Sequence, residues 1–86
     1  MIFSFAITSL AQPDVLDSLR NALVEHKSED STRVRLLINL SNNIVWDNTE
    51  EALQLAYEGL HLAQKIDWTK GEAFAYRQLN VVYYRM

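Results

Sequence analysis

Residues 50–66 read EEALQLAYEGLHLAQKI, and the small residues of this stretch decide the fold. Ala52, Ala56, Gly59 and Ala63 follow one another at spacings of four, three and four, which places them on one face of a helix. A core helix usually presents larger apolar side chains on such a face. We therefore predict that this helix packs unusually close to a neighbouring helix, with leucines filling the space on either side.

The composition favours helices and excludes several functional classes. The chain has 86 residues, which suggests one small domain or a piece of one, and its two glycines and one proline provide few turns for an all-β fold. A net charge of −3 argues against a nucleic-acid groove, which needs an excess of Lys and Arg. Without cysteine there is neither a disulfide nor a thiolate metal site. We expect an all-α fold.

The N-terminal residues 1–12, MIFSFAITSLAQ, have a different character from the rest. An apolar run ends in Ser9, Leu10 and Ala11, the small-x-small pattern of a signal-peptidase site. The run is too short to span a bilayer, which needs about 20 residues. We interpret it as a signal peptide truncated at its basic end, which predicts a periplasmic or secreted protein. If it is instead an apolar turn of helix, the protein is cytoplasmic.

Four helices are expected from the apolar periodicity and its interruptions, over residues 13–27, 31–46, 50–66 and 70–86. Three residue pairs before the last two helices have the spacing of a capping box: Asn48 with Glu51, Asp47 with Glu50, and Thr69 with Glu72. These pairs predict where the third and fourth helices begin.

The helices form an internal repeat. A shift of 39 residues superposes the second helix on the fourth, so that Leu37 meets Tyr76 and Leu40 meets Leu79. A shift of 37 residues superposes the first helix on the third, and Leu16 then meets Leu53. The chain therefore consists of two kinds of helix in the order B-A-B-A, with a period near 39.

These helices resemble those of the tetratricopeptide repeat family. The residues that carry the resemblance are Leu37, Leu40, Ser41 and Ile44 in one helix A, Tyr76, Leu79, Asn80 and Tyr83 in the next, and Ala52 and Gly59 in helix B. Two features depart from the family pattern: no proline closes helix B, and Asn80 replaces the usual glycine. The resemblance implies antiparallel hairpins over residues 13–86, stacked as a right-handed α-solenoid fragment.

The resemblance also implies a larger parent protein. The last helix is apolar on two sides, so we expect the array to be incomplete at the C-terminus. Repeats with this long period are similar to those ahead of the transmembrane helix in bacterial sensor histidine kinases, and to those of cytoplasmic peptide-sensing regulators. The signal-like start favours the first group, with the membrane reached only through a missing downstream segment.

A binding groove is expected on the side of helix A that faces away from helix B. The candidate groove residues are Arg35, Asn39, Asn42, Trp46, Phe74, Arg77, Gln78, Val81 and Tyr84. Arginines with neighbouring amides suit a peptide backbone or carboxylate, and aromatic residues suit apolar anchors. We therefore expect a protein or peptide ligand. The alternative is that the arginines are merely solvated and Trp46 belongs to the core.

No pattern in the sequence indicates catalysis, a cofactor or a metal. Glu58 and His61 have the Glu-x-x-His spacing of di-iron bundles, but only one copy is present, which makes a surface pair the better interpretation. His26 suits the C-terminal end of a helix. We predict a non-enzymatic interaction module. The alternative function is self-assembly into a homo-oligomer through the apolar last helix, residues 74–86.

Overall fold

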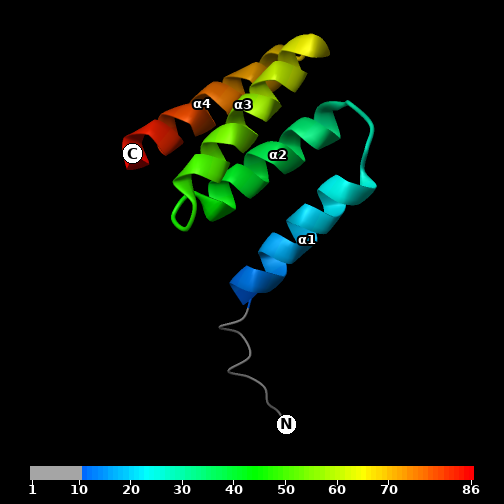
Figure 1. The fold of residues 1–86 in the computed structure, drawn as a ribbon. Helices are drawn as coiled ribbons and strands as arrows, with labels where there is room; N and C mark the ends of the chain where they lie inside the picture. The colour runs from blue at the N-terminus through cyan, green and yellow to red at the C-terminus, as the bar shows by residue number, and fades with distance from the viewer. Residues whose placement is uncertain (1–10) are drawn as a thin grey trace.

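The computed structural model describes residues 11–86, with side chains from Val15 onward, and this part of the chain is all-helical as expected. Its four helices are α1 (Ala11–Glu25), α2 (Ser31–Ile44), α3 (Thr49–Lys65) and α4 (Thr69–Arg85) (Figure 1). Each helix begins and ends within two residues of its predicted bounds. The predicted signal peptide lies outside the described residues, except for its last two. None of the described helices is long and apolar enough to cross a membrane.

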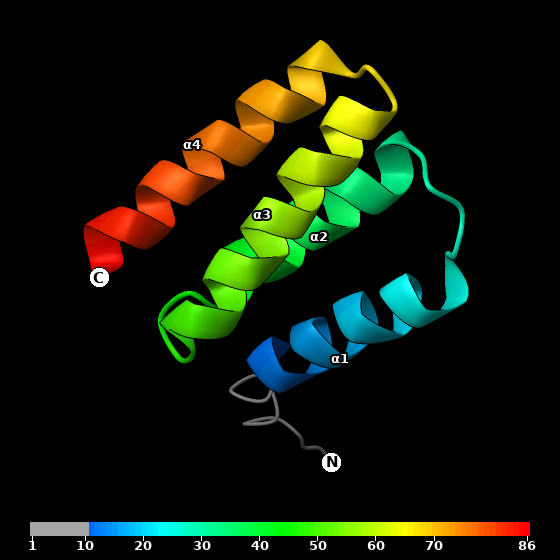
Figure 2. The same cartoon turned by 45° about the horizontal axis from the view of Figure 1, so that its top comes forward.

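Successive helices run antiparallel, and they form an open row (Figures 1 and 2). The central helix α2 contacts all three others, whereas α1 and α4 lie at opposite ends of the row and do not meet. Helices α2 and α4 run in the same direction and touch along their sides. The four helices therefore do not close around a single central axis.

The predicted close approach between α2 and α3 is confirmed. The apolar stripe of α2 is buried, and it consists of Val34, Leu37, Leu40 and Ile44. On α3, the side chains of Ala52, Ala56 and Ala63 have no exposed surface. A Cβ atom added to Gly59 would lie 3.1 Å from Cδ1 of Ile38, so a larger residue at this position would press on α2. The thin face of α3 thus faces its neighbours and not water.

Of the three predicted caps, one is confirmed and two are wrong. Asn48 caps α3, since its side chain accepts a hydrogen bond from the backbone N–H of Glu51, and Asp47 is therefore not the N-cap of this helix. Thr69 does not cap α4: that helix starts at Thr69 itself, the N-cap is Trp68, and no side chain bonds there. The backbone carbonyl of Trp68 already accepts the N–H of Glu72, which moves the helix start back by one residue.

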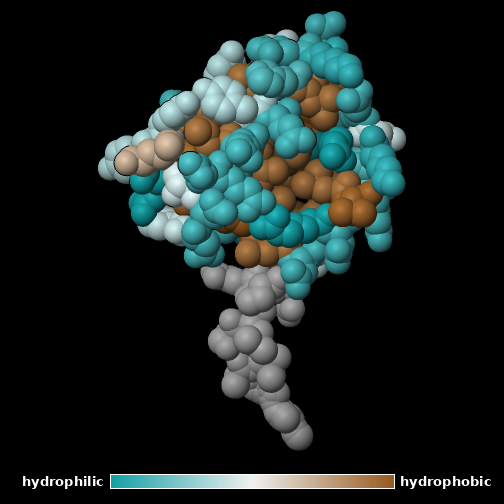
Figure 3. All heavy atoms as spheres, in the orientation of Figure 1, coloured by the Kyte–Doolittle hydropathy of each residue, from teal (hydrophilic) through white to brown (hydrophobic). Residues whose placement is uncertain are grey.

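Helix α1 packs on α2 through half-buried leucines, and hydrophobic side chains remain visible among hydrophilic ones where these helices meet (Figure 3). Polar contacts fix its position. Arg20 on α1 forms a two-pronged ion pair with Glu51 on α3, with its shorter N–O distance at 2.8 Å. Arg33 donates hydrogen bonds to the backbone carbonyls of Leu23 and His26. These carbonyls lie at the C-terminal end of α1, where the helix dipole favours a positive charge.

Candidate binding groove

The turn between α3 and α4 determines where the aromatic centre of the groove lies. Asp67 has φ 57, the left-handed conformation that ends many helices. This conformation lets the backbone N–H of Trp68 donate to the carbonyl of Ala63 at 2.8 Å, while the backbone N–H of Asp67 donates to the carbonyl of Gln64 at 3.1 Å. These are the two bonds of a Schellman motif, here with Asp in the place usually taken by Gly. The motif holds Trp68 over the first turn of α4.

Gly71 provides the space that the indole of Trp68 needs. A Cβ atom at this position would lie 2.2 Å from Cε3 of Trp68, a distance that real atoms do not reach. Gly71 therefore lets the ring lie against the start of α4, in spite of its helix-weakening tendency. The ring also packs edge to face with Phe74, with ring centroids 6.0 Å apart.

Two arginines flank this aromatic pair. The guanidinium carbon of Arg35, from α2, lies 5.2 Å from the centre of the Trp68 ring, and that of Arg77, from α4, lies 5.6 Å from the centre of the Phe74 ring. Both are within the range of a cation–π interaction. These contacts form a continuous row of side chains that links α2 to α4 across the groove and restrains both guanidinium groups. The row runs in the order Arg35, Trp68, Phe74, Arg77.

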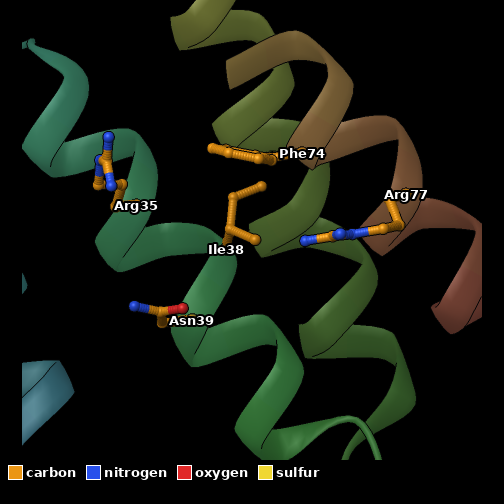
Figure 4. Close-up of a pocket in the computed structure, with 5 residues that line it drawn as sticks. All are labelled: Arg35, Ile38, Asn39, Phe74 and Arg77. Atoms are coloured by element: carbon orange, nitrogen blue, oxygen red, sulfur yellow. The ribbon is translucent and has the colours of Figure 1, made fainter. Parts of the chain in front are cut away.

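A cavity of about 180 Å³ opens between these side chains (Figure 4). It is lined by Arg35, Ile38, Asn39, Phe74 and Arg77. In Figure 4, Ile38 reaches from α2 toward α4, and Arg77 points back toward it. Four of the nine predicted groove residues therefore line a single cavity, and Ile38 supplies its apolar floor.

The other predicted residues are distributed differently. Trp46 is 69% exposed and lies under the guanidinium of Arg85, whose carbon is 3.3 Å from the ring centre. It is therefore not a core residue. Asn42, Val81 and Tyr84 are exposed as well. We call the cavity end of the α2/α4 face the arginine end, and the end defined by Trp46, Val81, Tyr84 and Arg85 the aromatic end.

Gln78 is the one predicted groove residue that the structure removes from the groove. It is 5% exposed, and its amide nitrogen donates to the hydroxyl of Ser41 at 3.1 Å. Ser41 in turn donates to the backbone carbonyl of Ala52 at 2.7 Å. Gln78 therefore joins three helices together, because its place on α4 turns it toward α2 and not toward the open side.

Charge is distributed unequally among the four helices. The charged residues of α2 and α4 give each helix a net charge of +2, and they are Arg33 and Arg35 in α2 and Lys70, Glu72, Arg77 and Arg85 in α4. Those of α1 and α3 give each helix −2, and they are Asp14, Asp17, Arg20 and Glu25 in α1 and Glu50, Glu51, Glu58 and Lys65 in α3. A basic face thus exists on a chain of net charge −3.

Sequence reasoning missed Ile38, Trp68 and Arg85. Trp68 lies in the connection before α4, outside the helix to which the groove was assigned, and its role depends on the turn geometry at Asp67. One sequence signal could have identified Trp68: a large aromatic residue is followed three positions later by Gly71, which has no side chain.

The other hollows found among the described residues do not bring arginine side chains from two helices together, as this groove does. Glu58 and His61 line a hollow of about 210 Å³ with Glu29 and Lys65, which form an ion pair with each other. Residues 15–86 contain no group of three or more His, Asp or Glu side chains able to hold a metal ion. Leu37 and Leu62 also line this hollow, whereas Glu58 and His61 are exposed, as expected for a surface pair.

Comparisons of the chain with protein-family models, curated proteins and solved structures give no match.

Proposed function

We propose that this chain is a protein or peptide interaction module of the tetratricopeptide type, which holds its ligand on the face formed by α2 and α4. The observation that carries the proposal is the cavity between these helices, where Arg35, Asn39, Phe74 and Arg77 converge from two different helices. A cavity with an apolar floor and a few polar groups of fixed orientation is the usual form of a binding site.

The arrangement of the helices supports the repeat assignment. Helices α2 and α4, which the internal repeat makes equivalent, run in the same direction and touch, and the small residues of α3 are buried between its neighbours. By its resemblance, the module would form the sensory or scaffolding part of a larger bacterial signalling protein. With residues 1–12 as a signal peptide, it would act outside the cytoplasm.

A peptide-display selection tests this proposal. Random peptides are selected on the full chain, and each selected peptide is then titrated against the Arg35→Glu/Arg77→Glu double variant, with circular dichroism to confirm unchanged helicity. We expect the selected peptides to lose binding to the double variant. If peptides bind both proteins equally, the α2/α4 face is not the binding site. The exposed control Lys27→Glu, in the connection between α1 and α2, makes the charge change of one of the two arginine replacements and should bind normally.

Self-assembly through α4 is the second candidate function. The tyrosines of α4 favour it, because Tyr76 and Tyr83 are each 52% exposed and Tyr84 is 88% exposed. Tyr76 and Tyr83 occupy the positions at which α2 carries the buried Leu37 and Ile44. A helix that docks on α4 as α3 docks on α2 would cover them.

A further inference from the structure

We infer that the ligand of the α2/α4 face is an extended acidic peptide segment, with a side-chain carboxylate at the arginine end and an aliphatic or aromatic side chain at the aromatic end. This inference rests on the proposed function and specifies the chemistry of its ligand.

The charge on this face carries the first part of the inference. Within residues 15–86 three ion pairs are present, and their cations are Arg20, His26 and Lys65. Arg35 and Arg77 therefore have no anionic partner in the part of the chain that the structure describes. No acidic residue lines their cavity either. The chain as a whole is acidic, so this positive field is local and would draw an anion to this face.

The fixed orientation of the two guanidinium groups points to a carboxylate. Each is held against an aromatic ring, Arg35 on Trp68 and Arg77 on Phe74, which leaves its N–H edge free to donate. A guanidinium fork matches a carboxylate in geometry, and restraint before binding lowers the entropy lost on binding. Asn39, exposed beside Arg35, adds an amide that can bond a peptide backbone.

The aromatic end accounts for the apolar side chain. Trp46 is fixed by Arg85 but remains 69% exposed, and Val81 and Tyr84, in the last turns of α4 with Arg85, are exposed as well. Arg35 and Ile44, at the C-terminal end of α2, are separated by about 14 Å at about 1.5 Å per helical residue, and Trp46 follows two residues later. An extended peptide covers that distance in about four residues. The acidic and apolar side chains of the ligand should therefore lie about four or five residues apart.

Titration of the full chain with designed peptides tests the inference. The probes are acetylated and amidated peptides of about ten residues, with two adjacent glutamates separated from one leucine by a Gly/Ser spacer, made in both directions. One matched peptide has glutamines in place of the glutamates, and another has a spacer of one residue. Binding is followed by amide and arginine side-chain NMR signals, which detect weak association.

We expect one direction of the acidic peptide to shift the signals of Arg35, Arg77 and Trp46. The glutamine peptide, the short-spacer peptide and added salt should each weaken binding about tenfold or more. Arg35→Gln/Arg77→Gln should abolish binding, and the Lys27→Glu control should not. Because the peptides are amidated, a terminal carboxylate cannot produce this result.

Several outcomes would overturn the inference. One such outcome is that the glutamine peptide binds the wild-type chain as tightly as the acidic peptide does, and that the arginine variant no longer binds it. The groove would then bind peptides without requiring acidic side chains, and only the proposed function would stand. Another outcome is that inorganic phosphate or a short RNA displaces the acidic peptide from the arginines at a concentration below the one at which the peptide itself binds. The site would then be a phosphate site. If no peptide of either kind binds, the proposed function fails as well.

Discussion

The side-chain amide of Gln78 on α4 donates to the hydroxyl of Ser41 on α2, and both groups are buried. The hydroxyl of Ser41 donates a hydrogen bond to the carbonyl of Ala52 on α3, so one chain of hydrogen bonds joins three helices. No side-chain nitrogen or oxygen buried within the described residues lacks a partner. Since apolar contacts are not directional, this chain of polar bonds fixes how far α4 slides along α2.

Removal of the Ser41 hydroxyl should destabilise the fold by more than its size suggests. Ser41→Ala leaves the buried amide of Gln78 without its acceptor, which costs about 1–3 kcal/mol. If Gln78 is also changed to Leu, no polar group remains unpaired, and the double variant should recover part of the loss. Urea unfolding of the two single variants and the double variant measures the coupling. Simple additivity of the two losses would contradict the proposed network.

The two glycines should respond in opposite ways to replacement by alanine. Gly59→Ala gains about 1 kcal/mol of helix propensity, and only the mobile end of Ile38 has to move. Gly71→Ala gains the same propensity but displaces the indole of Trp68 from its place between Arg35 and Phe74. We expect Gly59→Ala to be neutral or slightly stabilising, and Gly71→Ala to be destabilised by about 1 kcal/mol.

Tryptophan fluorescence separates the two effects. In a Trp46→Phe background only Trp68 emits, and its expulsion into water in Gly71→Ala should move the emission to longer wavelength. Gly59→Ala serves as the matched control and should leave the emission unchanged. An unchanged spectrum in Gly71→Ala would mean that the ring does not depend on this glycine.

The all-helical class and the bounds of the four helices were largely predictable because they depend on local or periodic features. Apolar spacing defined the four helices, and Asn48 with Glu51 defined the start of α3. The start of α4 was not predictable in the same way, because Asp67 and Trp68 end the preceding helix with backbone bonds alone. A capping-box spacing carries no information about such a turn.

The candidate site was predictable only in part. The repeat pattern placed Arg35, Asn39, Phe74 and Arg77 on one face, and they line one cavity. The same pattern could not tell Gln78 from its neighbours, because a difference of about 100° around the helix turns a residue from the groove into the interface. Nor could it place Trp68, which approaches from a connection.

Acid should loosen α1 before the rest of the fold. The hydrogen bond from His26, with that from the Arg33 backbone, lowers the pKa of Asp30, and the hydrogen bond from Arg20 lowers the pKa of Glu51. A lowered carboxyl pKa contributes stability above its unfolded value of about 4, and that contribution is lost as the pH falls through the lower folded value. Glu51 holds α1 to α3 through Arg20, and Asp30 at the start of α2 bonds His26, the residue that follows α1.

Amide NMR spectra recorded from about pH 7 to about pH 3 check this order of events. Signals of α1 should move or broaden at a higher pH than those of α3. The Asp30→Asn/Glu51→Gln variant should show a loosened α1 already near neutral pH, with little further change on acidification. Loss of α1 and α3 in a single step at the same pH would show that these two carboxylates do not control the attachment of α1.

If self-association occurs, it should depend on the side of α4 that carries Tyr76, Asn80 and Tyr83. These positions match Leu37, Ser41 and Ile44, which α3 covers on α2, so a bulky charge there should block any docking helix. Asn80→Arg is exposed and should fold normally, yet it should shift the protein toward monomer in sedimentation equilibrium. The control Gln54→Arg, exposed on the outer side of α3, should leave the association constant unchanged. Equal association of both variants would place the contact elsewhere, and a monomeric wild-type chain at the highest concentrations would remove the second candidate function. Because both variants retain residues 1–12, any association through that apolar segment is the same in each.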